Sequence, residues 1–377
     1  MIPYGRHYID ESDIQAVANA LRSDWLTTGP KVADFEKAVC DFTGAKYGVA
    51  VSNGTAALHA AFFAAGIKAG DEVIAPALTF VGTTNAAVYL GGKPVFVEIS
   101  PATLLINSAL IEAKITPKTK AIVAVDYAGQ PCDYTALRKI ADKHKLVLIA
   151  DSCHAIGAKQ QGANVGKLAD MSIFSFHPVK HITTGEGGMV VTENEEFARR
   201  MRRFRNHGIN TDHRQRAEAG TWHYEMIDLG FNYRLSDFQC VLGISQLKKL
   251  PGFLARRNEI ALIYDEAFKG IPGLVPVEKA PDSSHAYHLY PLRVDWQKIG
   301  KTKKAGFAYL REAGIHVAVH YPPVHLHPYY REKFGHKPGD LPITELAYEQ
   351  LLSIPIFPEM SPQDQQTVIA ALKKLLA

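Results

Sequence analysis

The sequence predicts an α/β protein in which a large domain built on a mostly parallel β-sheet is followed by a smaller α+β domain. The first two thirds of the 377 residues alternate short apolar runs with helix-like stretches, which indicates βαβ units. Several of these runs are apolar at consecutive positions, as expected for strands that are covered on both faces. From about Pro251 the alternation stops. We therefore expect one domain over residues 1–250 and a second over residues 251–377.

The expected elements follow from these runs. Seven segments of the first part are predicted to be strands: Tyr47–Val51, Glu72–Ala75, Pro94–Ile99, Ala121–Val125, Leu146–Ala150, Met171–Phe176 and Gly188–Thr192. Helical pieces are expected at Thr55–Ala65, Leu110–Ile115 and Cys132–His144. In the second part we expect a long helix near Phe253–Phe268, strands at Tyr287–Val294 and His316–Val319, and a last helix at Pro362–Leu375.

Composition narrows the class of protein. Hydrophobic residues make up 47% of the chain and charged residues 21%, the balance of a soluble globular protein. No apolar run reaches the roughly 18 residues needed to span a bilayer, and the first residues lack the pattern of a signal peptide. We therefore expect a cytoplasmic protein with no membrane partner. The net charge of +4 is too small to argue for nucleic acid, although it suits an anionic substrate.

The cysteines fit the same picture. The chain has four of them, far apart and without a C-x-x-C pair: Cys40, Cys132, Cys153 and Cys240. This spacing argues against a zinc ribbon or a disulfide framework, and indicates unpaired thiols in a reducing compartment.

One candidate binding segment is Ser52-Asn53-Gly54-Thr55-Ala56, which follows a predicted strand and opens a helix. The first N–H groups of a helix are unpaired and lie at the positive end of its dipole, so they bind phosphate well. Gly54 lets a ligand approach the backbone, and the Thr55 hydroxyl can donate a further hydrogen bond. Taken alone, however, such a segment is more often an ordinary strand-to-helix turn with a Thr cap.

Two further candidates are single charged residues. Asp151 follows the strand Leu146–Ala150, and the carboxyl ends of such strands are where open α/β sheets bind ligands. Its alternative role is to cap the next turn. Lys180 lies in a Gly- and Thr-rich loop just after another strand, near Ser175. Lysine forms Schiff bases with carbonyls, whereas a lone lysine is more often a solvated surface ammonium.

The combination of the three segments is more specific than any one of them. Pyridoxal 5'-phosphate (PLP) needs a phosphate anchor, a partner for its pyridine nitrogen and an amine for its aldehyde. The turn at Gly54–Ala56, Asp151 and Lys180 offer one of each. The sequence therefore predicts a PLP enzyme in which Lys180 holds the coenzyme and then moves a proton as general base and acid.

The chain resembles the DegT/DnrJ/EryC1/StrS family of PLP-dependent sugar aminotransferases over nearly its whole length. The likeness rests on a set of stretches that are specific only together: Trp25–Pro30, Ser52–Ala57, Asp151–Gly157, Phe174–Lys180, Glu186–Gly188, Asn206–Gly208 and Gly230–Arg234. It implies the aspartate aminotransferase-type (type I) PLP fold and a homodimer with active sites at the subunit interface. Cys153 stands where the family more often has Ala or Ser, which puts nothing of the mechanism in doubt.

The resemblance also implies roles for individual residues. Lys180 would bond to the coenzyme aldehyde, Asp151 would hold the pyridine nitrogen, and His154 would lie beside the ring hydroxyl. The remaining coenzyme contacts would come from Gly54, Thr55 and Ala56 with Ser175 at the phosphate, from Phe80 against the ring face, and from Asn232 of the partner subunit, with Arg234 as a weaker candidate.

On the substrate side, the resemblance implies contacts from the N-terminal arm and from a later loop: Tyr4, Trp25, Leu26, Thr27, Thr28, His320 and Tyr321. Within the family, stretches such as Trp222–Met226 and His320–His325 resemble members that aminate a UDP-linked 4-keto-6-deoxy-N-acetylhexosamine in pseudaminic acid biosynthesis. L-Glutamate would be the amino donor. Members that make UDP-4-amino-4-deoxy-L-arabinose share many of these stretches and are the nearest alternative.

Other interpretations stay open from the sequence. The same fold could serve a PLP-dependent sugar dehydratase or a non-catalytic regulator. Arg202, Arg203 and Arg205 could meet a diphosphate or a glutamate carboxylate, or could form a solvated helix face with salt bridges. The run of His320, His325 and His327 has no helical spacing and no acidic neighbour in sequence, so no metal site is expected.

Overall fold

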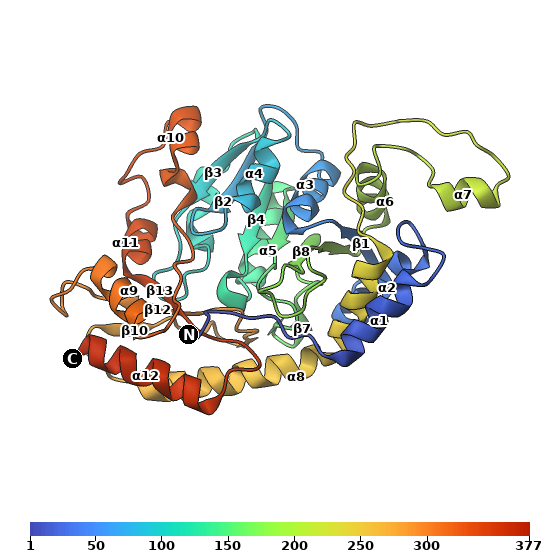
Figure 1. Cartoon of the computed structure of the whole chain (residues 1–377). Helices are drawn as coiled ribbons and strands as arrows, with labels where there is room; N and C mark the ends of the chain where they lie inside the picture. The colour runs from blue at the N-terminus through green and yellow to red at the C-terminus, as the bar shows by residue number, and fades with distance from the viewer.

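The computed structural model describes the backbone of residues 1–377 and every side chain except those of His213, Val275 and Pro276. A central sheet is covered by helices, and the long helix α8 (Asp237–Phe268) runs beneath it from one end of the molecule to the other (Figure 1). The last helix, α12 (Pro362–Leu376), packs along the far half of α8, so both chain ends lie on the same side of the molecule (Figure 1).

The central sheet has seven strands in the order β1-β9-β8-β5-β4-β2-β3. β2 pairs in parallel with β3 and β4, and β4–β5 and β5–β8 are also parallel pairs. β9 pairs antiparallel with both β8 and β1, so it alone runs against the others. The strands are β1 Tyr47–Val51, β2 Glu72–Pro76, β3 Lys93–Val97, β4 Thr119–Val125, β5 Val147–Asp151, β8 Met171–Ser175 and β9 Gly188–Thr192. The predicted mostly parallel sheet is confirmed.

Helices α3 (Gly54–Ala64), α4 (Gly82–Val88), α5 (Tyr134–His144) and α6 (Glu195–Phe204) lie against this sheet. α3 is apolar on all sides and nearly all of it is buried, because it packs on β8 and β9 as well as on α4 and α6. Its cap is Asn53 and not Thr55: Asn53 Oδ1 accepts from Ala56 N at 2.8 Å. The predicted helix at 110–115 is wrong, since two short 3₁₀ turns, η1 (Ser108–Leu110) and η2 (Glu112–Lys114), take its place; a third, η3, covers Tyr127–Gly129.

The helix α8 is much longer than the sequence predicted, because it begins at Asp237 and continues through Pro251. The helix starts with a capping box, in which the side chains of Ser236 and Gln239 each accept a hydrogen bond from the backbone N–H of the other residue. Proline in a helix interior removes one hydrogen bond and often ends the helix, which is why the prediction began after it. The predicted boundary at 250/251 falls inside this helix, and the division into two domains stays a prediction.

The C-terminal part has its own antiparallel sheet in the order β10-β12-β13, with β10 Leu274–Pro276, β12 Tyr290–Val294 and β13 Leu351–Ile354. The predicted strand at His316–Val319 is wrong, because this segment makes only isolated bridges at Ile315 and Ala318. α9 Lys303–Glu312 and α11 Pro342–Gln350 also belong to this part, whereas η4 Val324–Leu326 and α10 Pro328–Phe334 pack against the core of the central sheet. A third small sheet joins β6 Lys159–Gln160, β7 Ala163–Asn164 and β11 Ser283–Ser284.

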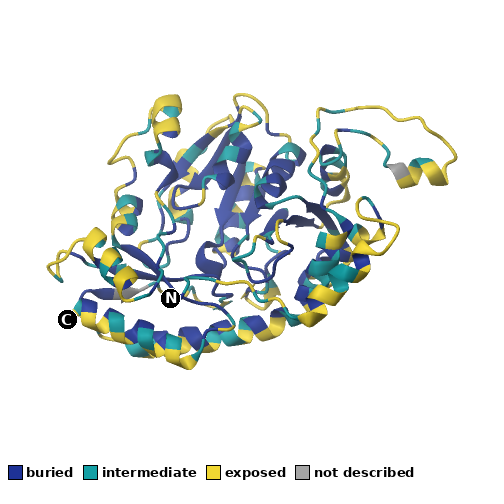
Figure 2. Ribbon diagram, viewed as in Figure 1, coloured by how far each residue is buried: buried dark blue, intermediate teal, exposed yellow. Residues whose placement is uncertain are grey.

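Burial follows the layers. The central sheet is buried almost throughout, and exposed residues lie on the outer faces of the helices (Figure 2). Within the segment 206–234, α7 (His213–Glu218) and the chain on either side of it stand away from the body and are largely exposed (Figures 1 and 2), whereas Phe231 and Tyr233 pack against the body. None of the helices among the described residues is both long and apolar enough to cross a membrane.

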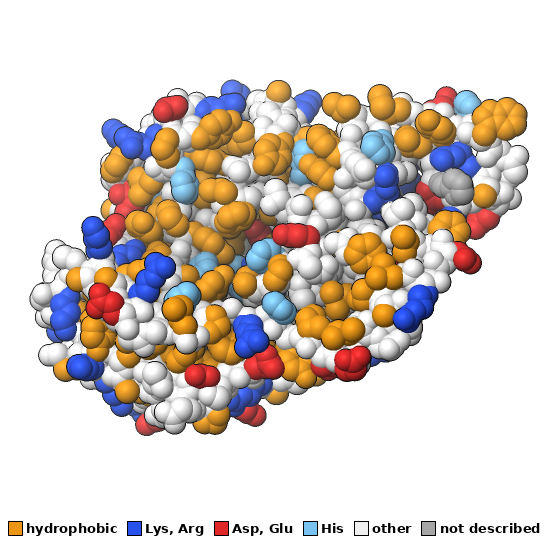
Figure 3. Space-filling model, in the orientation of Figure 1, with side chains coloured by type: hydrophobic (Ala, Val, Ile, Leu, Met, Phe, Trp, Pro, Cys, Tyr) orange, Lys and Arg blue, Asp and Glu red, His pale blue; other side chains and the backbone are white. Residues whose placement is uncertain are grey.

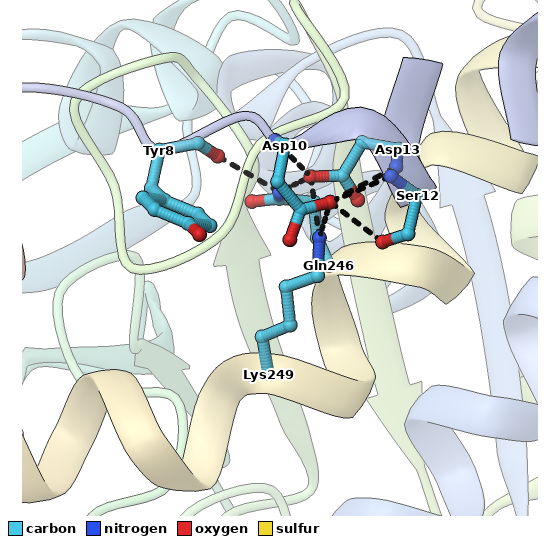
Figure 4. Close-up of polar contacts among 6 residues, drawn as sticks. All are labelled: Tyr8, Asp10, Ser12, Asp13, Gln246 and Lys249. Atoms are coloured by element: carbon cyan, nitrogen blue, oxygen red, sulfur yellow. Dashed lines mark hydrogen bonds and ion pairs between the residues drawn. The ribbon is translucent and has the colours of Figure 1, made fainter. Parts of the chain in front are cut away.

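The N-terminal arm is fastened to α8 by a charged cluster (Figure 4). The arm leads into α1 (Glu11–Leu21), which is followed by α2 (Pro30–Thr43). Lys249 Nζ donates to Asp10 Oδ1 at 2.6 Å and to Asp13 Oδ2 at 2.7 Å, and Gln246 Nε2 donates to Asp13 Oδ2 and to the carbonyl of Tyr8. Asp13 is fully buried, so its charge depends on these two donors and on the N–H of Asp10, at 3.2 Å.

Replacing Lys249 by Met should lower the free energy of unfolding by about 2–4 kcal/mol, because the Asp13 carboxylate loses its only cationic partner in the cluster. Urea unfolding at pH 7 measures the loss. Its matched control is Lys248→Met on the exposed neighbouring position, which should cost less than about 0.5 kcal/mol.

The pH dependence provides a second check. Lys249 holds the pKa of Asp10 well below its usual range. A lowered carboxyl pKa contributes stability above the unfolded-state value of about 4, and this contribution is lost as the pH falls below it. The gap between wild type and Lys249→Met should therefore narrow from pH 7 to pH 3. A constant gap would contradict the assignment.

Candidate active site

The carboxyl ends of β1, β2, β4, β5 and β8 meet at one edge of the central sheet, where they open into a cavity of about 640 Å³. Parallel strands place the residues that follow them on the same edge, which is where open α/β sheets bind their ligands. The face shown in Figure 3 is hollowed in its middle, with histidine and acidic side chains among apolar ones. Residues from the N-terminal arm and from the C-terminal part complete the wall.

The N-terminus of α3 forms one end of the cavity. A β-carbon on Gly54 would lie 3.1 Å from Ser175 Cβ and 3.2 Å from Cys153 Sγ, so a larger residue would have to displace these two side chains. Gly188 is required nearby, because a β-carbon there would lie 2.3 Å from the carbonyl oxygen of Asn53. Unpaired N–H groups of the first turn, with the hydroxyls of Thr55 and Ser175, make this end suitable for a phosphate.

Asp151 ends β5 in the floor of the cavity. Its side chain is almost fully buried, and Oδ2 accepts from Thr83 Oγ1 at 2.6 Å while Thr83 in turn contacts Thr79 Oγ1 at 2.7 Å. Oδ1 accepts only a long bond, 3.3 Å, from the N–H of Cys153. A buried carboxylate with this little compensation is stabilised by a cation that enters the cavity.

Lys180 lies in the turn after β8 and its side chain points into the same cavity. Burial lowers the pKa of its amine, and the neighbouring Cys153 and Asp151 oppose that shift. The one side-chain partner of Nζ among the described residues is His288 Nε2, at 3.4 Å. A desolvated amine of lowered pKa is a better nucleophile toward an aldehyde than a solvated lysine.

Aromatic rings surround the remaining walls. Tyr321 Oη lies 3.1 Å from His154 Nε2, and burial keeps the pKa of His154 well below its usual range. The Phe80 ring is 5.9 Å from Tyr321 and is half exposed at the mouth. Tyr4 of the N-terminal arm packs on His320, whose pKa burial lowers to about 4. The cavity therefore offers flat apolar faces with hydroxyl and imidazole groups at their edges.

Most of the predicted site residues are brought together here. The lining includes Tyr4, Gly54, Thr55, Ala56, Phe80, Asp151, His154, Ser175, Lys180, His320 and Tyr321. Trp25, Leu26, Thr27 and Thr28 do not line it; they form the exposed segment before α2, where Thr27 bridges to Ser236. Asn232 is also outside, exposed and bridged to Asn206, and Arg234 donates to Asn206 Oδ1.

The three arginines at the C-terminal end of α6 pair with carboxylates outside the cavity. Arg205 pairs with Glu36 at 2.5 Å, Arg202 also contacts Glu36, and Arg203 pairs with Asp228. None of the three lines the cavity. Arg203 and Arg205 are largely buried, so the prediction of a solvated face is wrong for these two residues, whereas the predicted salt bridges are present.

Sequence reasoning missed Thr79, Thr83 and His288. The two threonines follow β2, and only the tertiary fold brings their hydroxyls to Asp151. His288 comes from a segment more than 100 positions after Lys180. The pattern His285-Ala286-Tyr287-His288 lies between β11 and β12, and nothing in its periodicity points to the edge of the central sheet.

The fold and the residues at the sheet edge define an aminotransferase of the type I PLP fold. The DegT/DnrJ/EryC1/StrS aminotransferase family model matches residues 7–373, and the chain belongs to this family. Its members are PLP-dependent, so PLP is the coenzyme of this protein. The protein is a transferase that acts on a sugar.

Relatives and solved structures agree with the family assignment. The spore coat polysaccharide biosynthesis protein SpsC of Bacillus subtilis is 41% identical over all of this chain and 97% of its own length. Helicobacter pylori PseC, an aminotransferase of pseudaminic acid biosynthesis, superposes with a TM-score of 0.92 at 33% identity, covering 100% of this chain and 99% of its own. The sugar aminotransferase Spr1654 of Streptococcus pneumoniae, in its pyridoxamine phosphate form, gives a TM-score of 0.94 at 30% identity, with the same coverage.

The cavity fits PLP on its own geometry. The glycine-lined end at Gly54 accepts a phosphate, the undercompensated Asp151 carboxylate accepts a protonated ring nitrogen, and the buried Lys180 amine faces the same space. When bound, the coenzyme supplies an electron sink for the carbon that gains or loses a proton.

The Thr83 hydroxyl donates to a buried carboxylate, whereas the neighbouring Thr84 hydroxyl contacts a neutral group, Tyr330 Oη, at 2.8 Å. Thr83→Val should therefore lower the free energy of unfolding by about 1.5–3 kcal/mol, and Thr84→Val by about 0.5–1.5 kcal/mol. Chemical denaturation of the coenzyme-free protein compares the two. A larger loss for Thr84→Val would show that Asp151 does not depend on Thr83.

Proposed function

We propose that this protein is a nucleotide-sugar aminotransferase that moves the amino group of L-glutamate to C4 of a UDP-linked 4-keto-6-deoxy-N-acetylhexosamine. By this proposal it is a UDP-4-amino-4,6-dideoxy-N-acetyl-β-L-altrosamine transaminase of pseudaminic acid biosynthesis. The observation that carries the proposal is the placement of Lys180, Asp151 and the α3 N-terminus around one cavity whose outer wall bears Tyr4, His320 and Tyr321.

The residue roles follow from this arrangement. Lys180 would bond to the coenzyme aldehyde and, once released, would carry a proton between substrate carbon and coenzyme. Asp151 would keep the ring nitrogen protonated. Gly54, Thr55, Ala56 and Ser175 would bind the phosphate, since they surround the open end of the cavity.

His154 and Phe80 would border the coenzyme ring, because both line the cavity between Asp151 and its mouth. Phe80 is half exposed there and has an open face for a flat heterocycle. The Tyr321 hydroxyl contacts His154 Nε2 and so fixes the orientation of the imidazole ring. His154 Nδ1 has no partner among the described residues.

The sugar would lie toward Tyr4, His320 and Tyr321. Aromatic faces suit the apolar face of a sugar, and the tyrosine hydroxyls suit its oxygens. A pocket built to hydrogen-bond hydroxyl and acetamido groups discriminates well against substrates that lack them. The roles of PseC in pseudaminic acid biosynthesis and of SpsC in spore coat polysaccharide biosynthesis support a sugar that becomes part of a surface polysaccharide or glycan.

A second copy of the chain would complete the site. The segment 206–234 exposes a row of large apolar side chains, and Trp222 is 87% and Leu229 76% exposed. Apolar surface of this kind on an extended arm is typical of a subunit interface. In such a homodimer Asn232 of the arm, together with Trp25, Leu26, Thr27 and Thr28, would reach the other subunit's cavity.

Lys180→Ala should abolish the visible absorbance that glutamate bleaches, and should lower turnover at least about 10³-fold. Lys167→Ala, at an exposed lysine remote from the cavity, serves as the control and should leave both unchanged. Spectrophotometry with added glutamate and a coupled 2-oxoglutarate assay give the two readouts. Full turnover by Lys180→Ala would rule the role out.

Product analysis by NMR decides the substrate. The UDP-linked 4-keto-6-deoxy-N-acetylhexosamine should yield a 4-amino sugar with a higher kcat/KM than UDP-4-keto-arabinose, the substrate of the nearest alternative. The reverse preference would move the protein to that alternative. A deoxy sugar formed without glutamate would identify a dehydratase, and a protein that binds no PLP would indicate a non-catalytic member.

The dimer is tested by mixing two inactive chains. Lys180→Ala and Asn232→Ala dimers, unfolded and refolded together, should regain about a quarter of the wild-type activity, because half of the dimers are then mixed and each mixed dimer has one intact site. No regain after mixing would mean that Asn232 acts within its own subunit or not at all.

A further inference from the structure

Lys180 lies against a row of three buried imidazoles. His288 is nearest, and its ring centroid is 4.4 Å from that of His154 and 5.6 Å from that of His181. All three rings are more than nine-tenths buried. Burying a polar ring is unfavourable unless it makes hydrogen bonds, so the function of each ring can be read from the bonds it makes.

His154 and His181 each have a partner elsewhere. His154 Nε2 contacts the Tyr321 hydroxyl, and His181 Nε2 contacts the carbonyl oxygen of Ala286 at 2.9 Å. In all three rings Nδ1 has no partner among the described residues, and His288 differs from the other two because its Nε2 contacts Lys180 Nζ, at 3.4 Å. The one hydrogen bond that this ring makes is therefore to the lysine that we assign to the coenzyme.

The backbone around His288 is held rigidly. Arg257 of α8 donates to the carbonyls of Tyr287 and Ile356, both at 3.0 Å, with a longer 3.4 Å contact to that of His288 itself. On the two sides, Ala286 N donates to Gly129 O at 2.9 Å and Leu289 N to Ala128 O at 3.2 Å. His288 thus approaches Lys180 from a frame anchored to both α8 and the turn after β4.

The charges nearby keep this ring neutral. Burial, the Lys180 amine and the Arg257 guanidinium all hold the pKa of His288 well below its usual range. The other titratable groups that influence Lys180 or His288 are Asp151 and Cys153 on the β5 side, His154, His181 and, from the C-terminal part, His320. A neutral imidazole with its proton on Nδ1 has a free lone pair on Nε2 and accepts a hydrogen bond from an ammonium.

We propose that His288 is a positioning residue for Lys180: its neutral ring accepts a hydrogen bond at Nε2 from the protonated amine and fixes the direction of that amine in the cavity. This inference rests on the proposed role of Lys180. During turnover Lys180 gains a proton at Nζ and gives it up again, and the charged form is unfavourable in a buried site. His288 stabilises that form without competing for the proton.

The chain offers a matched set of variants. In His288→Gln the amide oxygen can take the place of Nε2, whereas in His288→Asn the side chain ends near the position of Nδ1 and cannot reach Lys180. Tyr287→Phe is the control, since it lies in the same segment and its buried hydroxyl has no partner among the described residues. The two His288 variants keep a polar side chain, and Tyr287→Phe keeps the shape of the ring. Circular dichroism establishes that each variant is folded.

The first measurement is made on the coenzyme-free protein. Acetic anhydride, a small reagent that acylates unprotonated amines, is used to label Lys180. Peptide mass spectrometry measures the rate of labelling as a function of pH. Losing a hydrogen bond to a charged group should move the midpoint of this titration about one pH unit lower in His288→Asn. His288→Gln should restore most of the shift, and Tyr287→Phe should match wild type.

The second measurement uses the PLP-loaded enzyme and follows two quantities against pH, the visible absorbance and kcat. The pH midpoint of the absorbance and the acid limb of the kcat profile should both differ between His288→Asn and wild type. His288→Gln should again be intermediate. Equal midpoints for His288→Asn and Tyr287→Phe in the coenzyme-free protein would overturn the proposal. Because this labelling needs neither coenzyme nor sugar, its failure is distinct from a failure of the proposed aminotransferase reaction.

Discussion

The site depends on the burial of two opposite charges at one edge of a parallel sheet, with few partners of their own. Asp151 keeps one oxygen almost free, and the Lys180 amine meets only a neutral imidazole. In water each group would be solvated and chemically ordinary. In the cavity, the ionisation of each group depends on what binds there. A coenzyme with a cationic ring nitrogen and an aldehyde offers a partner to the carboxylate and to the amine.

The surrounding structure keeps this edge from closing on itself. Gly54 and Gly188 occupy positions where a β-carbon would collide with Ser175 or with the backbone at Asn53. Their absence of side chains holds the phosphate end open. On the other side, the buried Arg257 donates to three carbonyls and has no acidic partner among the described side chains, so it fixes the backbone path around them.

The sequence predicted the parts of the fold that depend on local pattern. Apolar runs such as Leu146–Ala150 identify buried strands, and a strand followed by Asn53-Gly54-Thr55 identifies a helix start. Pattern failed where the tertiary structure overrides a local rule. Pro251 suggested a boundary, yet α8 continues through it because packing along both halves of the molecule compensates for one lost hydrogen bond.

The site divides in the same way. Asp151 and Lys180 could be placed at one edge of the sheet, because the first ends a strand, the second lies in the turn after another, and strand ends converge. Thr83 and His288 could not, since their roles arise only from distances between side chains that are remote in sequence. Trp25–Thr28 and Asn232 lie outside the cavity of their own chain, and only the proposed dimer would bring them to a cavity.

The N-terminal arm has a consequence for the order in which the protein is made. Ile2 pairs with the backbone of Gly314 and His316, and the carbonyl of Tyr4 accepts from Ile356 N. Residues 2–4 therefore cannot reach their native positions until the chain has been made at least as far as Ile356. Until then the wall of the cavity that Tyr4 provides is missing, so a nascent chain that has already formed its central sheet still lacks a complete cavity.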